Sequence, residues 1–180
     1  MIEYYTFKHR GDADEYKDEV FFRNSLPITI AIFYGSKIES APRSQALLFS
    51  EILSSEEGSK KISDIEKVFE ECLDEESEYF ILRVLDKGIE STRRGDVCAK
   101  IVRNGQISLL PNGYFGLTDE DWIICATSNF YRYLNDEGIL ADALVSYNCG
   151  DWMKLMIRRI SDQTQLKCGN LSAIALKLRT

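Results

Sequence analysis

Acidic side chains are the residues of this sequence that could hold a divalent metal ion. Of the 29 acidic residues, the candidates for a shared metal site are the pair Asp18 and Glu19, the single Asp96, and the row over residues 119–121. Hard cations such as Mg²⁺ and Mn²⁺ prefer anionic oxygen, and two such cations side by side need several carboxylates. A metal centre built from these acids therefore requires that three distant segments converge in the folded chain.

The end of a predicted strand is a second place where chemistry could occur. Residues 122–127 are apolar or small and predict a buried strand, and the polar pair Ser128 and Asn129 follows it. Strand ends that precede a helix are favoured positions for functional side chains. The pair also fits a structural role, because such residues commonly cap a helix, here over residues 130–134.

The acids of residues 119–121 lie at the beginning of that same strand. A strand of this length separates them from Ser128 by about 20 Å, at ~3.3 Å per residue. This distance disfavours a metal site shared between the two ends. We therefore expect residues 119–121 to form a solvated loop.

Histidine and cysteine give little support for nucleophilic or metal chemistry. The one histidine, His9, follows the first predicted strand in a polar turn, so a Ser-His or Cys-His pair depends on it alone. The five cysteines are odd in number and include no CxxC pair, which argues against a disulfide framework and against a zinc site. Cys98 and Cys125 lie in apolar runs and are expected in the core.

Length and composition favour one soluble domain over residues 1–180. The chain is 44% hydrophobic and has only 3 prolines, which argues against disorder. No apolar run approaches the ~20 residues of a membrane helix, and the first residues contain no apolar signal region, so we expect a cytoplasmic protein without a membrane partner. The net charge of −7 disfavours nucleic acid and could suit a basic protein partner.

The apolar periodicities define an order of elements. Strands are predicted over residues 2–7, 18–22, 26–34, 78–92, 96–110, 122–127 and 171–178, with turns at 86–88 and 104–105 inside the two longer segments. Helices are predicted over residues 40–53, 62–76, 136–147 and 151–162, the first opened by Ser40 and the third capped by Asn135. Helices grouped between antiparallel hairpins predict an α+β fold with helices outside the β-sheets.

The order of elements and five short stretches resemble the PP2C family of metal-dependent serine/threonine phosphatases. The stretches are KDEVFF (17–22), ITIAIFYGS (28–36), RRGDVCAKIVRNGQI (93–107), DWIICATSNFYRYL (121–134) and CGNLSAIALKL (168–178). The resemblance covers most of the chain in the right order. It implies an α+β sandwich of two antiparallel β-sheets flanked by helices. The chain is also shorter than a full member between the hairpin at 104–105 and the strand at 122.

The resemblance assigns this chain's residues to the positions of the family's metal site. Glu19, with Asp18 beside it, occupies an aspartate position. The remaining matches fall on strand ends, at Tyr34-Gly35 for an Asp-Gly pair, Asp96 for the aspartate of Gly-Asp-Ser, Ser128-Asn129 for a second Asp-Gly pair and Gly169-Asn170 for the closing Asp-Asn.

The resemblance also implies what the chain has lost. In the family, aspartates at these strand ends hold two divalent metals that activate a water, whereas this chain offers Tyr34, Ser128 and Gly169. A single glutamate cannot hold a two-metal centre. We therefore expect no metal cofactor, no catalytic residue, and a PP2C-like pseudophosphatase that works as a regulatory module by binding a protein partner.

Two alternatives remain open from the sequence. The chain could be an active metal-dependent phosphatase with a rearranged site, which would use Mn²⁺ or Mg²⁺ and need Asp18, Glu19, Asp96 and residues 119–121 to converge. The resemblance could also be accidental, which would leave an unassigned α+β domain.

Overall fold

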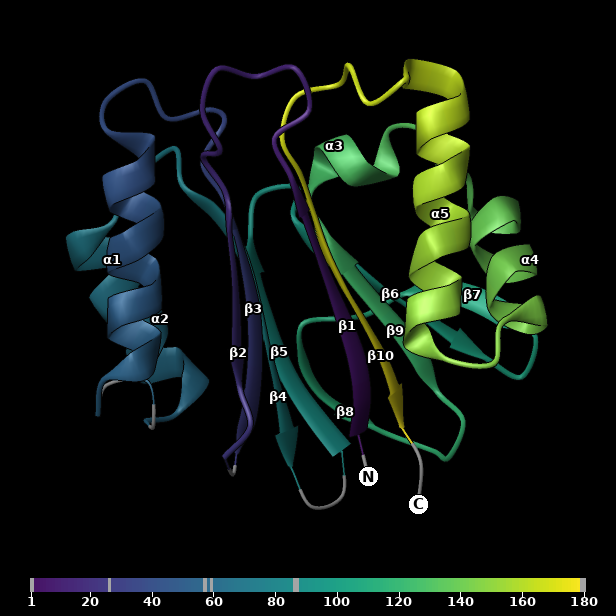
Figure 1. Ribbon diagram of the computed structural model, residues 1–180. Helices are drawn as coiled ribbons and strands as arrows, with labels where there is room; N and C mark the ends of the chain where they lie inside the picture. Colours follow the sequence, from purple (N-terminus) through teal and green to yellow (C-terminus); the bar gives the residue numbers. More distant parts are fainter. Residues whose placement is uncertain (1, 26, 57, 59, 86–87, 179–180) are drawn as a thin grey trace.

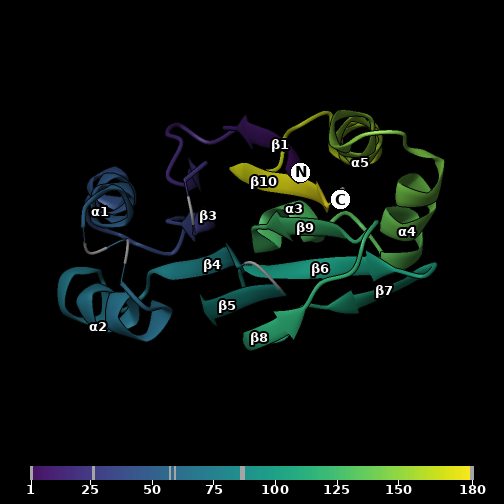
Figure 2. The same ribbon diagram turned by 90° about the horizontal axis from the view of Figure 1, so that it is seen from below.

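The computed structural model describes residues 2–25, 27–56, 58, 60–85 and 88–178. Two five-stranded antiparallel β-sheets pack face to face, and helices cover both outer faces (Figure 1). Seen along the strands, the order of layers is helices, sheet, sheet, helices (Figure 2). The predicted α+β sandwich with helices outside the sheets is confirmed.

One sheet has the strand order β2-β3-β4-β5-β8 and is covered by two helices. Its strands are β2 (Glu19–Arg23), β3 (Ile28–Tyr34), β4 (Glu78–Leu85), β5 (Gly88–Arg94) and β8 (Gly113–Gly116). Its helices are α1 (Pro42–Ser54) and α2 (Ile62–Cys72). An apolar cluster that includes Phe49, Phe69 and Ile81 fills the space between the helices and this sheet.

The other sheet has the strand order β1-β10-β9-β6-β7 and is covered by three helices. Its strands are β1 (Ile2–His9), β10 (Leu171–Leu178), β9 (Trp122–Ala126), β6 (Cys98–Arg103) and β7 (Gln106–Leu109). Its helices are α3 (Ser128–Tyr131), α4 (Asp136–Val145) and α5 (Cys149–Thr164). Trp152 and Met156 of α5 are buried against this sheet.

Strand β3 shows why the central strands read as unbroken apolar runs. Successive side chains of a strand point to opposite faces. Ile30 and Ile32 enter the core between the two sheets, whereas Ala31 and Phe33 enter the core under α1 and α2. Because both faces of the sheet are covered, neither set can be polar.

Several predicted boundaries are corrected by the structure. Helix α1 is not opened by Ser40, because Ala41 is the N-cap residue in the left-handed region (φ 49°) and Pro42 begins the helix. Helix α2 ends at Cys72 instead of residue 76, since Leu73 has extended backbone and is buried. Strand β8 was not predicted. Residues 26, 86 and 87, which belong to a predicted strand and a predicted turn, lie outside the described residues.

The strand register brings all of the resemblance positions to one end of the sandwich. The pairs at this end are Tyr34 with Glu78, Tyr79 with Arg94, Cys98 with Ala126 and His9 with Leu171. The loop between β1 and β2 lies at this end, at the top of Figure 1. Val102 pairs with Trp122 at the opposite end, next to the predicted turn at Asn104 and Gly105, both of which have the positive φ of a tight hairpin.

Candidate functional site

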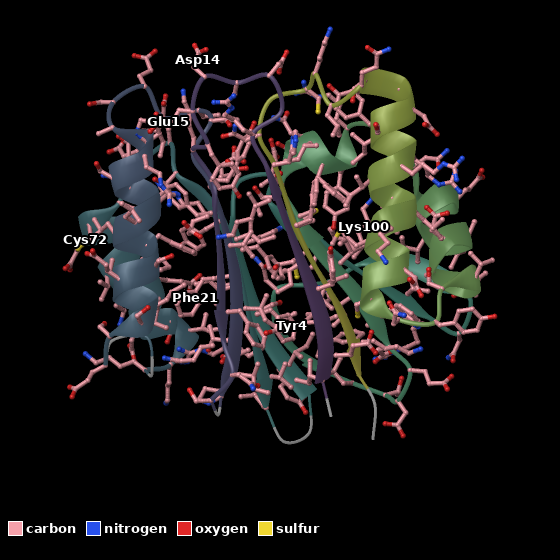
Figure 3. All side chains as sticks on the ribbon, in the orientation of Figure 1. Tyr4, Asp14, Glu15, Phe21, Cys72 and Lys100 are labelled. Atoms are coloured by element: carbon pink, nitrogen blue, oxygen red, sulfur yellow. The ribbon has the colours of Figure 1, made fainter. Side chains whose placement is uncertain are left out.

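The candidate site is the cluster of strand ends at which the two sheets meet. Figure 3 shows Asp14 and Glu15 on the β1–β2 loop above this end, while Tyr4 and Phe21 lie further along β1 and β2. Residues from both sheets and from this loop contact one another here. The contacts described below decide which of them are free to do chemistry.

Asp18 lies directly before β2 and is completely buried. One carboxylate oxygen accepts the backbone N–H of Gly35 at 3.3 Å, and the other accepts the hydroxyl of Ser172 at 2.6 Å. Ser172 also lies 2.7 Å from the phenol oxygen of Tyr16. Burial raises the pKa of Asp18 to about 7, because the surroundings disfavour its charged form. The carboxyl group thus serves as a buried polar link between the sheets.

Glu19, the acid assigned to the first aspartate position of the family, is held by two cations. Its carboxylate forms an ion pair with Lys8 of β1, and Arg43 of α1 lies 2.9 Å from the other oxygen. Burial alone would raise the pKa of Glu19, but the hydrogen bonds and charges of Lys8 and Arg43 outweigh burial and lower it. Both oxygens of this carboxylate are therefore occupied.

Glu78 at the start of β4 is a further buried acid at this end, which the sequence reasoning missed. It forms an ion pair with Lys37 and accepts the backbone N–H of Asp96 at 3.1 Å. The hydrogen bond to Glu78 raises the pKa of Lys37. A lone glutamate that opens a strand gives no local signal, and only its register with Tyr34 places it here.

Asp96 lies at the edge of this cluster and faces solvent. Its side chain is 74% exposed, and its carboxylate is 3.5 Å from the Lys37 ammonium group. Lys37 is therefore the cation shared by Glu78 and Asp96. A single carboxylate that is exposed on a turn is poorly placed to hold a metal ion.

The amide side chains at this end close the loops. Asn170 accepts the backbone N–H of Lys17 at 2.6 Å and donates to the carbonyls of Arg10 and Glu15 at 3.1 and 3.0 Å. Asn129 donates to the carbonyl of Asn170 at 3.3 Å. These bonds hold the β1–β2 loop against the start of β10, so both asparagines have structural roles.

Tyr34, Gly35 and Gly169 are set by packing and backbone geometry. The Tyr34 ring is buried in the core between the sheets. A Cβ at Gly35 would lie 2.3 Å from the carbonyl oxygen of Lys17, so only glycine fits. Gly169 has a φ of +71° and donates its N–H to Asp12 at 2.8 Å.

Ser128 is the first residue of α3 and not its cap. Thr127 is the N-cap residue of this helix, and its side chain makes no capping hydrogen bond. The expected capping role of Ser128 and Asn129 is therefore wrong, because both residues lie inside a helix that spans Ser128–Tyr131 instead of residues 130–134. Asn135, in contrast, caps α4 as predicted, with its side chain accepting the N–H of Gly138 at 2.8 Å.

The donor set at this end does not fit a two-metal centre. The oxygens of Asp18, Glu19 and Glu78 already accept bonds from hydroxyl, amide or cationic groups. Within the described part of the chain, no group of three His, Cys, Asp or Glu side chains is arranged to hold a metal ion. Two close divalent cations require more carboxylate oxygen than is free here.

The acids of residues 119–121 lie at the other end of the sandwich, as their place before β9 predicts. Asp121 is buried and accepts bonds from Arg103, with Nε at 2.7 Å from Oδ1. It also accepts the backbone N–H of Thr118 at 2.7 Å. The expected solvated loop is correct for Asp119 and Glu120, which are exposed, and wrong for Asp121.

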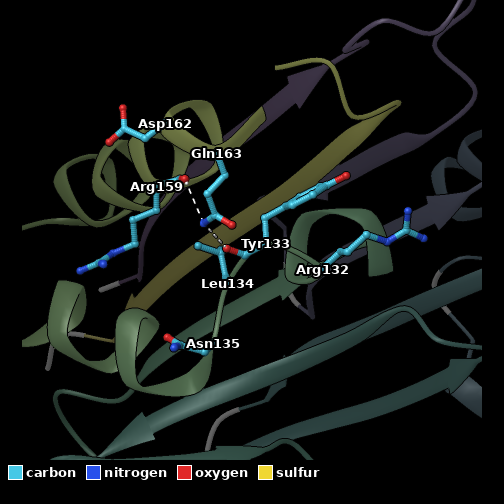
Figure 4. Close-up of a pocket in the computed structure, with 7 residues that line it drawn as sticks. All are labelled: Arg132, Tyr133, Leu134, Asn135, Arg159, Asp162 and Gln163. Carbon is cyan, nitrogen blue, oxygen red and sulfur yellow. Dashed lines mark hydrogen bonds between the residues drawn. The ribbon is translucent and has the colours of Figure 1, made fainter. Parts of the chain in front are cut away.

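A hollow of about 520 Å³ lies away from the strand ends, between α5 and the α3–α4 connection. Its lining is polar and includes Arg132, Asn135, Arg159 and Gln163. Figure 4 shows that the side chains of Arg132 and Arg159 point away from each other. Arg159 is also bound to both oxygens of Asp142, at 2.7 Å each. These two guanidinium groups therefore cannot clamp one anion.

The sandwich has the fold of the PP2C-type serine/threonine phosphatases. Similar solved structures include the photosystem II phosphatase PBCP, with a TM-score of 0.79 and 12% identity over 99% of both chains. RsbX in complex with magnesium has a TM-score of 0.81 and 13% identity over 98% of this chain and 95% of that one. The S. agalactiae serine/threonine phosphatase has a TM-score of 0.78 and 12% identity over 99% of this chain and 100% of that one.

These likenesses establish the fold, and sequence comparison adds nothing to them. No family model matches the sequence, and no curated protein is significantly similar to it. In the described part of the chain, no helix combines the length and the apolar character that a membrane span requires.

Proposed function

We propose that this chain is a PP2C-like pseudophosphatase, a single domain that binds or regulates a protein partner and does not carry out metal-dependent hydrolysis. One observation carries the proposal. The acids at the strand ends are neutralised by the protein's own cations, with Lys8 and Arg43 on Glu19 and Lys37 on Glu78. Side-chain cations thus form ion pairs with the carboxylates that a metal ion would need as ligands.

The fixed cations also lead us to expect a fold that is stable without metal. Carboxylates gathered at one place repel each other unless a cation lies between them. Lys8 and Arg43 supply positive charge next to Glu19, and Asp18 avoids the repulsion by the raised pKa that burial gives it. The fold in this proposal therefore gains little from added metal, and none is a cofactor.

The active-phosphatase alternative needs a rearrangement of these contacts. Asp18 and Glu19 would have to release Ser172, Lys8 and Arg43, and Asp96 would have to turn inward. The acids of residues 119–121 lie at the opposite end and cannot join them. Nothing in the arrangement favours this alternative over the first proposal.

Calorimetric titration with Mn²⁺ and Mg²⁺, followed by a phosphatase assay on the same sample, tests the proposal. We expect no saturable heat at millimolar metal and no turnover of a phosphoserine peptide. Binding of two ions with hydrolysis would overturn it. Asp18→Asn is the control, because a true metal centre at the strand ends would lose both signals in that variant.

A further inference from the structure

The C-terminal end of α4 leaves a group of large apolar side chains in solvent. Leu144 and Val145 are each 66% exposed, and Tyr147 in the following turn is 83% exposed. Ala143, Leu144 and Val145 are consecutive residues of α4, and successive residues of a helix are rotated by about 100° around its axis. At least one of the three must therefore face away from the sheet. Ala143 is buried and the other two point outward.

A hollow of about 200 Å³ adjoins this group. It lies between the end of α4, the β6–β7 turn at Asn104 and Gly105, and the loop before β9, and Leu144 is part of its wall. Helix α4 and strand β7 lie side by side in both Figure 1 and Figure 2, at the edge of the sheet. Leu144 therefore connects the exposed apolar group to this concave surface, and Val145 and Tyr147 lie beside it in the sequence.

The wall of this hollow is acidic. Asp119, Glu120 and Asp121 line it together with a single cation, Arg103. Arg103 is committed to the buried carboxylate of Asp121. Asp119 and Glu120 are exposed and form no ion pair with any described residue. Two unneutralised carboxylates thus stand next to exposed apolar side chains.

We propose that this surface, made of Asp119, Glu120, Leu144, Val145 and Tyr147, binds a segment of a partner protein that carries apolar side chains flanked by Lys or Arg. The inference rests on the proposed protein-binding function and names the chemistry of its partner. Apolar anchors in a concave site supply most of the affinity of an interface. Complementary charges at its rim select the partner and speed the encounter.

Charge decides against the other occupants. A second copy of this chain would bring Asp119 and Glu120 toward identical carboxylates across a two-fold axis, and like charges at an interface are unfavourable. Nucleic acid would present phosphates to the same acids, and the net charge of the chain is −7. A basic and apolar segment satisfies both halves of the surface.

The probe for the test is a fluorescein-labelled amphipathic peptide of Leu and Lys, about 15 residues or about four helical turns long. Binding is followed by fluorescence anisotropy at about 50 mM and about 300 mM salt, since screening weakens the ionic part. A peptide in which Glu replaces every Lys serves as the charge control. We expect saturable binding of the Lys peptide alone, weaker at the higher salt.

Two double variants divide the surface into its apolar and acidic halves. Leu144→Ser with Val145→Ser is expected to weaken binding about tenfold, because the apolar anchor is lost. Asp119→Asn with Glu120→Gln is expected to weaken it about threefold and to reduce its salt dependence. The side chains are exposed, so both variants should unfold at the temperature of the parent.

Matched controls change the same chemistry elsewhere. Leu47→Ser removes an exposed leucine from α1, on the other outer face. Asp14→Asn with Glu15→Gln removes two carboxylates from the β1–β2 loop, at the opposite end of the sandwich. We expect both controls to bind the peptide as the parent does.

Several outcomes would overturn the assignment. These are absence of saturable binding, equal binding of the Glu peptide, or equal weakening by the controls. Sedimentation that shows a dimer of the parent and a monomer of the Leu144→Ser, Val145→Ser variant would make a second copy the occupant. Metal titration and a turnover assay on the same sample distinguish failure of this docking surface from failure of the proposed function. Hydrolysis overturns the pseudophosphatase, whereas loss of peptide binding alone overturns only this surface.

Discussion

The carboxylate of Asp18, directly before β2, accepts a hydrogen bond of 2.6 Å from the hydroxyl of Ser172 in β10. These two strands belong to different sheets, so this bond fastens one half of the sandwich to the other. Asp18 is completely buried, and its second oxygen is bound by the N–H of Gly35 at 3.3 Å. The buried carboxyl group of Asp18 therefore helps to hold the two sheets together.

The pKa of Asp18 predicts that stability falls as pH rises. Burial raises this pKa from 3.8 to about 7, so the folded state holds the proton more tightly than the unfolded state does. The contribution of Asp18 to the free energy of unfolding is complete below about pH 4 and is lost as pH rises through about 7. By linkage, this contribution is at most about 4 kcal/mol.

Urea unfolding at about pH 5 and about pH 8 measures this loss. Asp18→Asn should flatten the difference between the two pH values, because asparagine does not titrate in this range. Asp14→Asn in the exposed loop should leave the difference unchanged. An identical pH dependence in the parent and in Asp18→Asn would show that Asp18 does not titrate as its burial requires.

Removing the charge of Glu19 should destabilise the fold by about 1–2 kcal/mol, because Glu19→Gln leaves Lys8 and Arg43 without their shared anion. The two cations remain partly exposed, which limits the cost. Because the pKa of Glu19 is lowered in the folded state, its contribution to the free energy of unfolding is present at neutral pH. That contribution is lost as pH falls through the pKa of the folded state.

Chemical denaturation of Glu19→Gln at neutral pH is the measurement. Asp64→Asn is the matched control, since it breaks an exposed ion pair of 3.6 Å with Lys67 on α2 and should leave the midpoint unchanged. Equal effects of the two substitutions would mean that the contacts of Glu19 are no stronger than those of a surface pair.

Loss of charge at Asp121 should destabilise the fold far more than loss of charge at its neighbour Glu120. Asp121→Asn is expected to cost about 2 kcal/mol, because the partly buried guanidinium group of Arg103 loses its anion. Glu120→Gln should change stability by less than about 0.5 kcal/mol, as exposed substitutions do. Thermal or urea unfolding of the two variants checks the contrast. Similar stabilities would place Asp121 in solvent.

Restoring carboxylates should restore metal binding if the assigned positions are right. The triple variant Tyr34→Asp, Ser128→Asp, Gly169→Asp should bind Mn²⁺ more tightly than the parent does. Adding Lys8→Ala should increase this affinity, because it frees one oxygen of Glu19. Titration calorimetry measures both gains.

The matched control for restored metal binding replaces the same three residues by asparagine. It changes shape in the same way but adds no charge, and hard cations prefer carboxylate. Circular dichroism must accompany each titration, because Tyr34 fills the core between the sheets and Gly169 has a positive φ. A folded aspartate variant that binds no more Mn²⁺ than its asparagine counterpart would contradict the assignment of the site.

The fold could be predicted where local patterns were strong. The apolar run of β3 and the Asn104-Gly105 turn each had a clear local cause, and both appear as expected. Strand β8 could not be predicted, because Gly113–Gly116 has two glycines in four residues and no alternation. It exists through pairing with β5, where Phe115 lies opposite Ile89.

The candidate site was predictable in its position but not in its contacts. The sequence indicated which strand ends would gather, and the register placed them together. Glu78 and Lys37 were missed, since neither residue belongs to a motif and their partnership spans 41 positions. The interpretation of Asp121 failed for a similar reason, because its ion-pair partner Arg103 lies in strand β6, 18 residues earlier in the chain.

The sequence by itself determined the residue types at the strand ends, and thus that Tyr34, Ser128 and Gly169 offer no carboxylate to a metal. It also determined the alternation of elements that builds the sandwich. Only the tertiary structure decided what neutralises the remaining acids. Lys8 and Arg43 meet Glu19 from another sheet and from a helix, and a pairing of that kind is set by how layers pack.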